Sequence, residues 1–388
     1  MQDLLDVMEN IYNGRDNMAF FCKFSRDDAS LGEITLFSGG KEFMAMDSMI
    51  NMEGAINASM YEGKEIPIAV PYDFVTEVFP KSGVRRSEFP LLMGFYPEKT
   101  LHGRYVRKND HVNSRFASFD GDTDFERIVS DCRDRIIAGE LLQIVLSRSM
   151  NLGDISFPDL VRGFMERDRS LYVFLYRIGE FTIAGSSPEN LITVNERKAE
   201  IYPIAGTIRR GKDKQEDEAL GKILMESEKD KLEHRMLVDL ARNDLGKVSV
   251  KGSVTVPQSM VLRKYATVQH LVSKVESFIR EDVGPMDILK AVFPAGTVSG
   301  APKRRAVELI DRYERSPRGA YAGALGVIGN GTMDLALIIR SAFRSQCRTY
   351  TQAGAGIVKD SDPEAEGREV ISKAMTVLGG VESECVGN

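Results

Sequence analysis

The chain has 388 residues, 43% of them hydrophobic, which is enough for one large domain or two ordinary ones. Its formal net charge of -6 lacks the basic character of a nucleic-acid-binding protein, so we expect no nucleic-acid partner. No apolar run approaches the roughly 18 residues of a membrane span, and the N-terminus has no basic-then-apolar signal pattern. Four scattered cysteines without CxxC spacing fit a reducing compartment. These features predict a cytoplasmic protein with no membrane partner.

The elements change in character along the chain. Residues 1 to about 115 contain short alternating segments, such as 33–37 and 66–70, which are typical of sheet. A loop at 109–123 is a weak candidate boundary. Beyond it we expect a helix over 124–140, strands over 141–150, 172–176 and 181–185, and one long helix over 214–242. Strands and helices then recur over 253–256, 260–280, 285–293, 302–314, 321–329, 333–346 and 350–358, before a last helix at about 363–379.

The connections between these elements are too irregular for a repeated βαβ pattern. Sequential strands without an intervening helix are typical of antiparallel pairing. The pattern by itself therefore predicts an α+β protein with much antiparallel sheet.

The last helix carries charged residues on one face. It begins at Asp362-Pro363, which suit the cap and first helical positions, and ends before Gly379-Gly380. Glu366, Glu369 and Lys373 follow the i, i+3, i+7 spacing of one helix face. The functional interpretation is a ligand-binding face. The alternative is a solvated acidic first turn that complements the helix dipole.

A second pair of carboxylates, Asp230 and Glu233, lies three residues apart in the helical stretch 214–242. Two helices that each present two carboxylates could hold a hard cation such as Mg²⁺, which prefers oxygen ligands. The alternative is an ordinary charge network on an exposed helix.

Glycine-rich turns at 203–211, 293–303 and 352–358 place small residues beside apolar strands. Such turns let backbone N–H groups approach an anion, or they simply satisfy tight-turn geometry. None is a Walker A loop or a complete dinucleotide fingerprint, which disfavours a nucleotide enzyme. His270 is one of only four histidines; a catalytic role and a structural role both remain open.

Taken together, these segments resemble the chorismate-utilising enzymes, and among them component I of anthranilate synthase. No single segment is decisive, but the set, in this order, is highly specific. The matching stretches are Gln143-Ile-Val-Leu-Ser-Arg, Gly185-Ser-Ser-Pro-Glu, Pro203-Ile-Ala-Gly-Thr, Glu233-His-Arg-Met-Leu-Val-Asp-Leu-Ala-Arg-Asn-Asp, Val268-Gln-His-Leu-Val-Ser, Ala295-Gly-Thr-Val-Ser-Gly-Ala-Pro-Lys, Arg318-Gly-Ala-Tyr-Ala-Gly-Ala, Ile338-Ile-Arg-Ser and Gln352-Ala-Gly-Ala-Gly-Ile-Val-Lys-Asp-Ser.

The resemblance implies a fold and a division of the chain. It implies one chorismate-utilising unit over 1–388, built as a large α/β sandwich of two mainly antiparallel sheets with helices packed outside. The matching region lies within a catalytic portion at 124–380. Residues 1–115 match poorly and are expected to form a divergent portion for regulation and partner contact.

The resemblance also implies the residues of the site. Glu233 and Glu369 would hold Mg²⁺, with Glu366 as a near neighbour and Asp230 acting through water, since Asp is about one methylene shorter than the usual Glu. Glu189 would be the general acid, His270 would transfer a proton or position the ring during elimination, and Thr297 would line the ring pocket. The substrate-binding residues would be Gly206, Thr207, Tyr321, Arg340, Gly354, Gly356 and Lys373.

Two positions separate members of the family. Where this chain has Gln143, enzymes that use water carry a lysine base, so the glutamine favours ammonia as the nucleophile. Where this chain has Ala205, many aminodeoxychorismate synthases carry a lysine that attacks the ring. Both residues favour anthranilate synthase, with aminodeoxychorismate synthase component I as the alternative and a non-catalytic subunit of the same fold as a third. Ammonia would come from a separate glutamine amidotransferase subunit.

Overall fold

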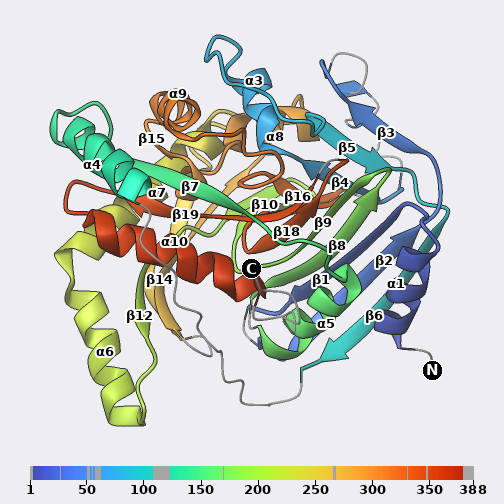
Figure 1. Ribbon diagram of the computed structural model, residues 1–388, viewed down its shortest axis with the longest axis horizontal. Coiled ribbons are helices and arrows are strands. Elements are labelled where there is room, and N and C mark those ends of the chain that lie inside the picture. Colours follow the sequence, from blue (N-terminus) through green and yellow to red (C-terminus); the bar gives the residue numbers. More distant parts are fainter. Residues whose placement is uncertain are drawn as a thin grey trace.

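The computed structural model describes residues 3–26, 28–49, 53–54, 56, 63–107, 123–168, 170–264, 268–329, 331–346 and 348–378. In this part of the chain the strands form two large sheets (Figure 1). The first has nine strands in the order β15 (Gly300–Ala301), β7 (Gln143–Asn151), β19 (Thr349–Ile357), β18 (Ser341–Arg344), β9 (Phe181–Ser187), β8 (Tyr172–Ile178), β1 (Met18–Phe24), β2 (Leu31–Ser38) and β6 (Lys99–Val106).

The second sheet has ten strands, and its order mixes N-terminal and C-terminal segments. The order is β12 (Ile204–Arg209), β14 (Val268–Phe278), β11 (Lys198–Ile201), β10 (Asn190–Asn195), β17 (Thr332–Leu337), β16 (Ala324–Gly329), β4 (Ile66–Val70), β5 (Leu92–Phe95) and β3 (Glu42–Ala45), and β13 (Thr255–Lys264) also pairs with β14. The strand pairs are antiparallel in both sheets, for example β8 with β9 and β16 with β17. Strands from residues 18–106 therefore belong to both sheets.

Successive side chains along a strand point to opposite faces of the first sheet, and each face has its own hydrophobic core. Ala19 and Phe21 of β1 are buried in the largest core, together with residues of the second sheet, so the two sheets pack face to face. Phe20 and Cys22 point the other way, into a smaller core beneath α1 (Leu4–Asn13) and α5 (Phe157–Arg167). A third core lies between β7 and β19 and the helices α4 (Thr123–Ile137), α9 (Lys303–Tyr313) and α10 (Pro363–Leu378).

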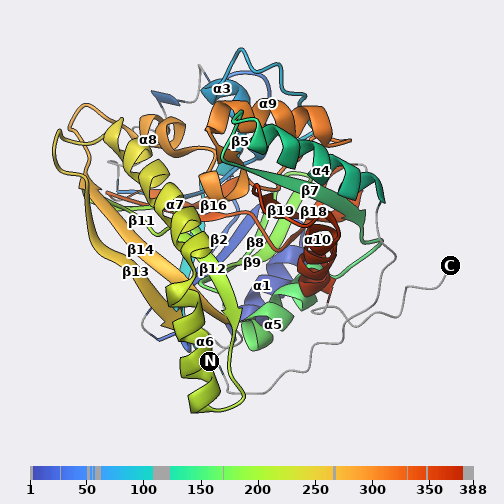
Figure 2. The same cartoon turned by 90° about the vertical axis from the view of Figure 1, so that its left-hand side faces the viewer.

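Other helices cover the second sheet. Helices α6 (Lys214–Glu226) and α7 (Glu228–Gly246) pack against β12 and β14, and α8 (Pro285–Val292) contacts α7 (Figure 2). The short helices are η1 (Tyr72–Phe74), α3 (Val75–Val78) and η2 (Gly296–Val298). The expected α+β class, with two mainly antiparallel sheets and helices outside, is confirmed.

Several expected elements differ from the structure. The expected segments 253–256 and 260–280 are instead the antiparallel pair β13 and β14. The stretch 214–242 is two helices, because Ser227 has an extended backbone and caps α7. The stretch 333–346 is β17 and β18, which belong to different sheets. The expected boundary at 109–123 lies almost wholly outside the described residues, as do Gly379 and Gly380 at the end of the last helix.

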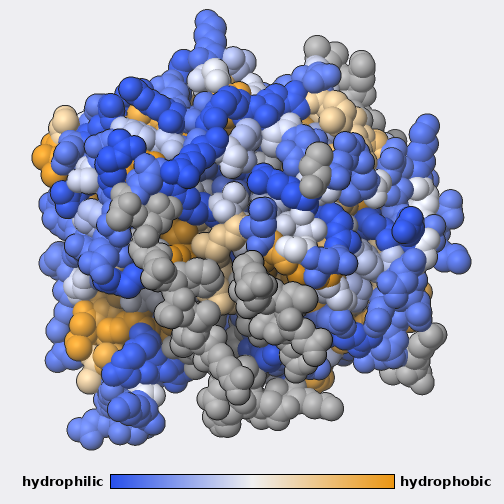
Figure 3. Space-filling model, viewed as in Figure 1, coloured by the Kyte–Doolittle hydropathy of each residue, from blue (hydrophilic) through white to orange (hydrophobic). Residues whose placement is uncertain are grey.

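The face in Figure 3 is mostly hydrophilic, with scattered apolar patches. Exposed apolar side chains include Ile223 of α6 and Leu232 of α7, each 59% exposed. Among the described residues, no helix combines the length and apolar character needed to cross a membrane.

Candidate active site

Helix α7 begins at a serine cap that places two carboxylates in its first two turns. The backbone N–H of Asp230 donates to the Ser227 hydroxyl at 3.3 Å, and that hydroxyl donates to the Asp230 carboxylate. Glu233 lies almost one turn further along and is partly buried. Because α7 packs on β12 and β14, Asp230 lies beside β12, where a Cβ at Gly206 would be 3.1 Å from its Oδ1.

Helix α10 brings the other two predicted carboxylates to the same place. Burial raises the pKa of Glu233, and the negative charges of Asp230, Glu369 and Glu366 raise it further, while Lys229 opposes them. Burial also raises the pKa of Glu366, with Glu369 acting in the same direction. The four carboxylates predicted from two distant helices therefore form one cluster of like charges, which a bound cation would stabilise.

The carboxylates of this cluster could supply part of the ligand shell of a metal ion. Within the described ranges, no three His, Cys, Asp or Glu side chains are arranged as a metal cage. Mg²⁺ commonly takes one or two carboxylates and completes its shell with water and substrate oxygens. Glu369 also forms an ion pair with Lys373 at 2.5 Å, so this cation shares the carboxylate when no metal is bound.

Strand β19 presents two glycines where side chains would block close approach. A Cβ at Gly354 would lie 2.7 Å from the Tyr321 hydroxyl, and a Cβ at Gly356 would lie 2.9 Å from Gln143 Nε2. Lys373 Nζ donates to the carbonyl oxygen of Gly354 at 3.2 Å. Predicted substrate-binding residues from three separate segments thus meet at one stretch of backbone.

Arg340 lies where the chain passes from β17 in one sheet to β18 in the other. Its φ of +48° is in the left-handed region, which a residue with a Cβ rarely adopts and which often marks a functional position. Its carbonyl accepts a hydrogen bond from Ser186 N–H at 3.2 Å. In the described part of the chain its guanidinium forms neither a hydrogen bond nor an ion pair. A carboxylate could be held there bidentately.

Glu189 lies in the turn between β9 and β10, and its carboxyl is enclosed by protein although the residue keeps some exposed surface. Burial raises its pKa to about 7, and the Thr297 hydroxyl and the charge of Arg26 oppose this rise. The Thr297 hydroxyl makes no hydrogen bond of regular geometry with the described residues. Both side chains line a cavity of about 30 Å³, which is enough for a water-sized molecule. A carboxyl that is half protonated at neutral pH suits a general acid.

His270 lies on β14 opposite Thr207 of β12. Its Nδ1 lies 3.1 Å from the Gly206 carbonyl oxygen and 3.0 Å from the Thr207 hydroxyl. A carbonyl can only accept, so Nδ1 carries the proton and the lone pair is on Nε2. Burial and then the charge of Arg340 lower the pKa of His270. The imidazole is therefore neutral at pH 7 and able to accept a proton.

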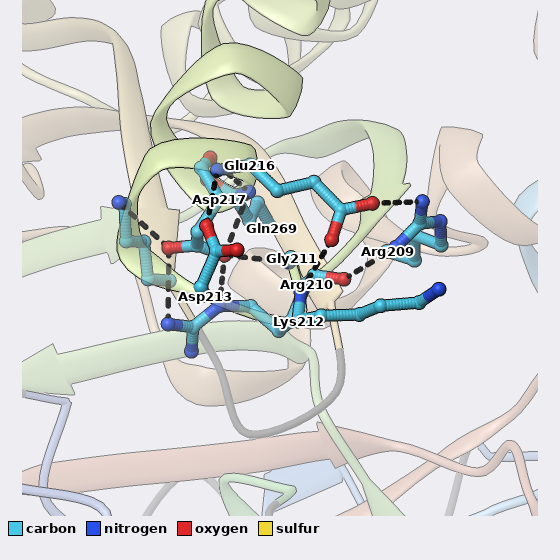
Figure 4. A network of polar contacts seen from close by, with 9 residues as sticks. Arg209, Arg210, Gly211, Lys212, Asp213, Glu216, Asp217 and Gln269 are labelled. Carbon is cyan, nitrogen blue, oxygen red and sulfur yellow. Dashed lines mark hydrogen bonds and ion pairs between the residues drawn. The ribbon is translucent and has the colours of Figure 1, made fainter.

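Asp217 of α6 connects the loop after β12 to strand β14 through hydrogen bonds (Figure 4). Its carboxylate accepts from Arg210 at 2.7 Å and from the backbone N–H of Gly211 at 3.0 Å, and Lys264 lies 2.8 Å away. Gln269, which precedes His270, donates to the Asp217 backbone oxygen at 2.9 Å. Hydrogen bonds from these donors lower the pKa of Asp217, so the connection stays ionised and fixes the strands that carry Thr207 and His270.

The sequence patterns missed residues that surround Glu189 from other parts of the chain. Arg26 follows β1 of the first sheet, whereas Asn190 begins β10 of the second sheet and Tyr202 lies between β11 and β12. Arg26 Nη2 nevertheless donates to Asn190 Oδ1 at 3.0 Å. The Arg26 guanidinium also lies 3.8 Å from the centre of the Tyr202 ring. No local spacing could have indicated this, because the contact exists only once the two sheets pack together.

Comparison with known proteins identifies a family and several relatives of this chain. A family model described as chorismate binding enzyme matches residues 99–379. Anthranilate synthase component 1 of Neisseria meningitidis serogroup B is 45% identical over 260 residues, 66% of this chain and 53% of that protein. The protein of the same name from Methanothermobacter thermautotrophicus is 46% identical over 66% of this chain and 55% of its own length. The chain thus spans about half the length of the curated relatives it matches.

Solved structures extend the comparison to nearly the whole fold. Anthranilate synthase component I from Streptococcus pneumoniae superposes with a TM-score of 0.73 at 30% identity, over 94% of this chain and 92% of that one. A putative isochorismate synthase from Bacillus anthracis superposes with a TM-score of 0.77 over 97% of this chain and 99% of that one, but at 22% identity it shows the fold alone. With the family match covering residues 99–379, the chain belongs to the chorismate binding enzymes.

Proposed function

We propose that this chain is the large subunit of an anthranilate synthase, acting in the cytoplasm in the first step of tryptophan biosynthesis. The reaction converts chorismate and ammonia into anthranilate, pyruvate and water. The observation that carries the choice within the family is the pair Gln143 and Ala205. Both are buried at the site, and neither can supply the amine that a lysine would place there. The relatives named anthranilate synthase component 1, at 45–46% identity, support the same choice.

The first step joins ammonia to C2 of chorismate while the C4 hydroxyl leaves. Hydroxide is a poor leaving group, so Glu189 donates its proton and the group departs as water. Arg340, Tyr321 and the backbone around Gly354 hold the substrate carboxylates and fix the ring in place. Bound by Glu233 and Glu369, Mg²⁺ would neutralise the ring carboxylate beside the reacting carbons.

The second step removes the enolpyruvyl group. In the aminated intermediate, loss of the proton at C2 and cleavage of the C–O bond at C3 release pyruvate and make the ring aromatic. His270 is assigned to this step because it is neutral and its tautomer leaves Nε2 able to accept a proton. Thr207 and the Gly206 carbonyl hold its ring in orientation.

Ammonia is proposed to come from a separate glutamine amidotransferase subunit. A glutaminase of that kind needs a reactive thiolate, and burial raises the thiol pKa to about 12 for both Cys22 and Cys132. Cys347 and Cys385 lie outside the described residues.

The identity of the products formed from chorismate tests the proposed function. Purified chain is incubated with chorismate, Mg²⁺ and either ammonium or glutamine, and products are separated and read by fluorescence. Anthranilate and pyruvate in equal amounts, formed with ammonium and not with glutamine, are expected. Aminodeoxychorismate without pyruvate would move the protein to the folate branch. Equal rates with glutamine would remove the need for a partner, and no turnover of chorismate would leave a binding subunit.

Replacing Gly354 by alanine tests the carboxylate-binding stretch. The added Cβ would meet both the Tyr321 hydroxyl and the Leu146 carbonyl oxygen at 2.7 Å. We expect KM for chorismate to rise about tenfold or more, with a loss of stability of about 1–3 kcal/mol, because β19 must shift. Ala353→Gly on the same strand is the control, since Ala353 points into the core beneath α10. Ala353→Gly should lower the melting temperature and leave KM for chorismate unchanged. Equal KM values in the two variants would contradict the assignment of Gly354 to substrate binding.

A further inference from the structure

Arg26 reaches from the N-terminal portion to the strand that follows the proposed acid. It lies two residues beyond β1 of the first sheet, whereas Asn190 begins β10 of the second sheet and Tyr202 lies in the connection between β11 and β12 of that sheet. The guanidinium lies 3.8 Å from the centre of the Tyr202 ring, and Nη2 donates to Asn190 Oδ1 at 3.0 Å. An arginine that is both stacked on an aromatic face and hydrogen-bonded at its edge keeps few of its rotamers. The charge therefore has a defined place next to the Glu189 turn.

The partners of Arg26 are themselves fixed. The Tyr202 hydroxyl donates to Glu200 at 2.7 Å, and Lys274 pairs with the same carboxylate at 2.8 Å. Asn190 Nδ2 lies 3.4 Å from the backbone oxygen of Glu200. The aromatic ring and the amide are thus held by neighbouring strands of the second sheet, so that Arg26 rests on a rigid support.

Few other charged groups influence Glu189. Thr297 faces it with an uncharged hydroxyl. Asp244 of α7 lines the same cavity, but Lys303 pairs with it at 2.5 Å. Of the charged side chains in the described residues, Arg26 is the one whose field acts on the Glu189 carboxyl, and it lowers the pKa that burial raises. Removing this charge should therefore keep Glu189 protonated to higher pH.

We propose that Arg26 is a positioning residue for Glu189: clamped by Tyr202 and Asn190, its guanidinium holds the turn that carries the acid and keeps a positive charge beside it. The inference rests on the proposed function, in which Glu189 donates a proton. It gives the N-terminal portion, which precedes the residues 99–379 matched by the family model, an indirect part in catalysis through Glu189.

Three variants distinguish the effect of the Arg26 charge from the effect of its hydrogen-bonding geometry. Arg26→Gln removes the charge and keeps an N–H donor for Asn190, whereas Arg26→Lys keeps the charge and loses the planar fork. Lys23→Met is the matched control, because Lys23 lies on β1 and also bridges the sheets, but it pairs with Asp334 at 2.5 Å and not with the Glu189 turn. Chorismate turnover with saturating ammonium is measured from pH 5.5 to 9 for each protein.

The alkaline limb of kcat, where Glu189 loses its proton, is expected to move up by about one pH unit in Arg26→Gln. Arg26→Lys should keep the limb near its wild-type position while kcat falls severalfold, and Lys23→Met should leave the limb unchanged. An unmoved limb in a folded Arg26→Gln variant, or an equal shift in Lys23→Met, would overturn the proposal.

An infrared titration keeps this test separate from the activity. The protonated carboxyl band of Glu189, identified by its loss in Glu189→Gln, is followed against pH in the wild-type and Arg26→Gln proteins. A wild-type chain that does not turn over chorismate would contradict the proposed function. An upward shift of the band's midpoint pH in Arg26→Gln would still support the role of Arg26. An unchanged midpoint would refute it.

Discussion

Glu189→Gln is expected to lower kcat with chorismate and ammonium by about 10²–10⁴-fold, with KM for chorismate changed by no more than about threefold. Glutamine has nearly the shape of the protonated acid but cannot donate that proton to the departing C4 hydroxyl. Burial raises the pKa of the enclosed Glu189 carboxyl to about 7, so its protonation state changes around neutral pH. Steady-state kinetics at pH 7 measures the effect.

Glu196→Gln is the matched control. Glu196 is an exposed glutamate at the other end of the β10 segment, and its replacement should leave both constants unchanged. A Glu189→Gln variant that retained more than about a tenth of the wild-type kcat would exclude Glu189 as the acid.

The same substitution should change how stability depends on pH. Burial raises the Glu189 pKa from its ordinary value of 4.5 to about 7 in the folded protein, so the folded protein binds the proton more tightly than the unfolded chain does. This preference stabilises the fold fully below about pH 4.5. This contribution, on the order of 3 kcal/mol, is lost as the pH rises through 7. Wild type should therefore lose stability relative to Glu189→Gln between these values, as denaturant unfolding at several pH values can show.

Glu233→Gln is expected to lower turnover by about 10²-fold or more at a fixed Mg²⁺ concentration and to weaken Mg²⁺ binding. It removes one of the four clustered carboxylates on α7 and α10; burial and then the charges of Asp230, Glu369 and Glu366 raise the pKa of Glu233. Calorimetry with Mg²⁺ alone gives a readout independent of catalysis. Without metal, the variant should be at least as stable as wild type, because a repulsive charge has been removed.

Glu226→Gln, on the exposed end of α6, serves as control for this change. Chelation of Mg²⁺ should abolish wild-type turnover and hardly alter the residual activity of Glu233→Gln. Unchanged Mg²⁺ affinity in Glu233→Gln, or full activity of wild type in excess chelator, would contradict the metal assignment.

The features predicted correctly from the sequence are those that depend on residues close together in the chain. A last helix at about 363–379 was expected from its cap, and at the start of α10 Asp362 accepts a hydrogen bond from the backbone N–H of Ala365 at 2.8 Å. Strands were also expected at 172–176 and 181–185, and the structure has β8 and β9 there, joined through Gly179, whose positive φ suits a tight turn. By contrast, Ser227 was not recognised as a cap, because the residues on both sides of it favour helix.

The amino-acid sequence by itself determined the local elements, the spacing of the carboxylates on each helix and the set of motifs that reveals the family. Only the tertiary structure decided that α7 and α10 face one another, that Arg340 lies at a crossing between sheets and that Arg26 reaches the Glu189 turn. The physical reason is that capping and periodicity act within a few residues, whereas these contacts depend on the packing of two sheets through a shared apolar core. Their energies, and the pKa values they set, arise from burial and from charges that are distant in the chain.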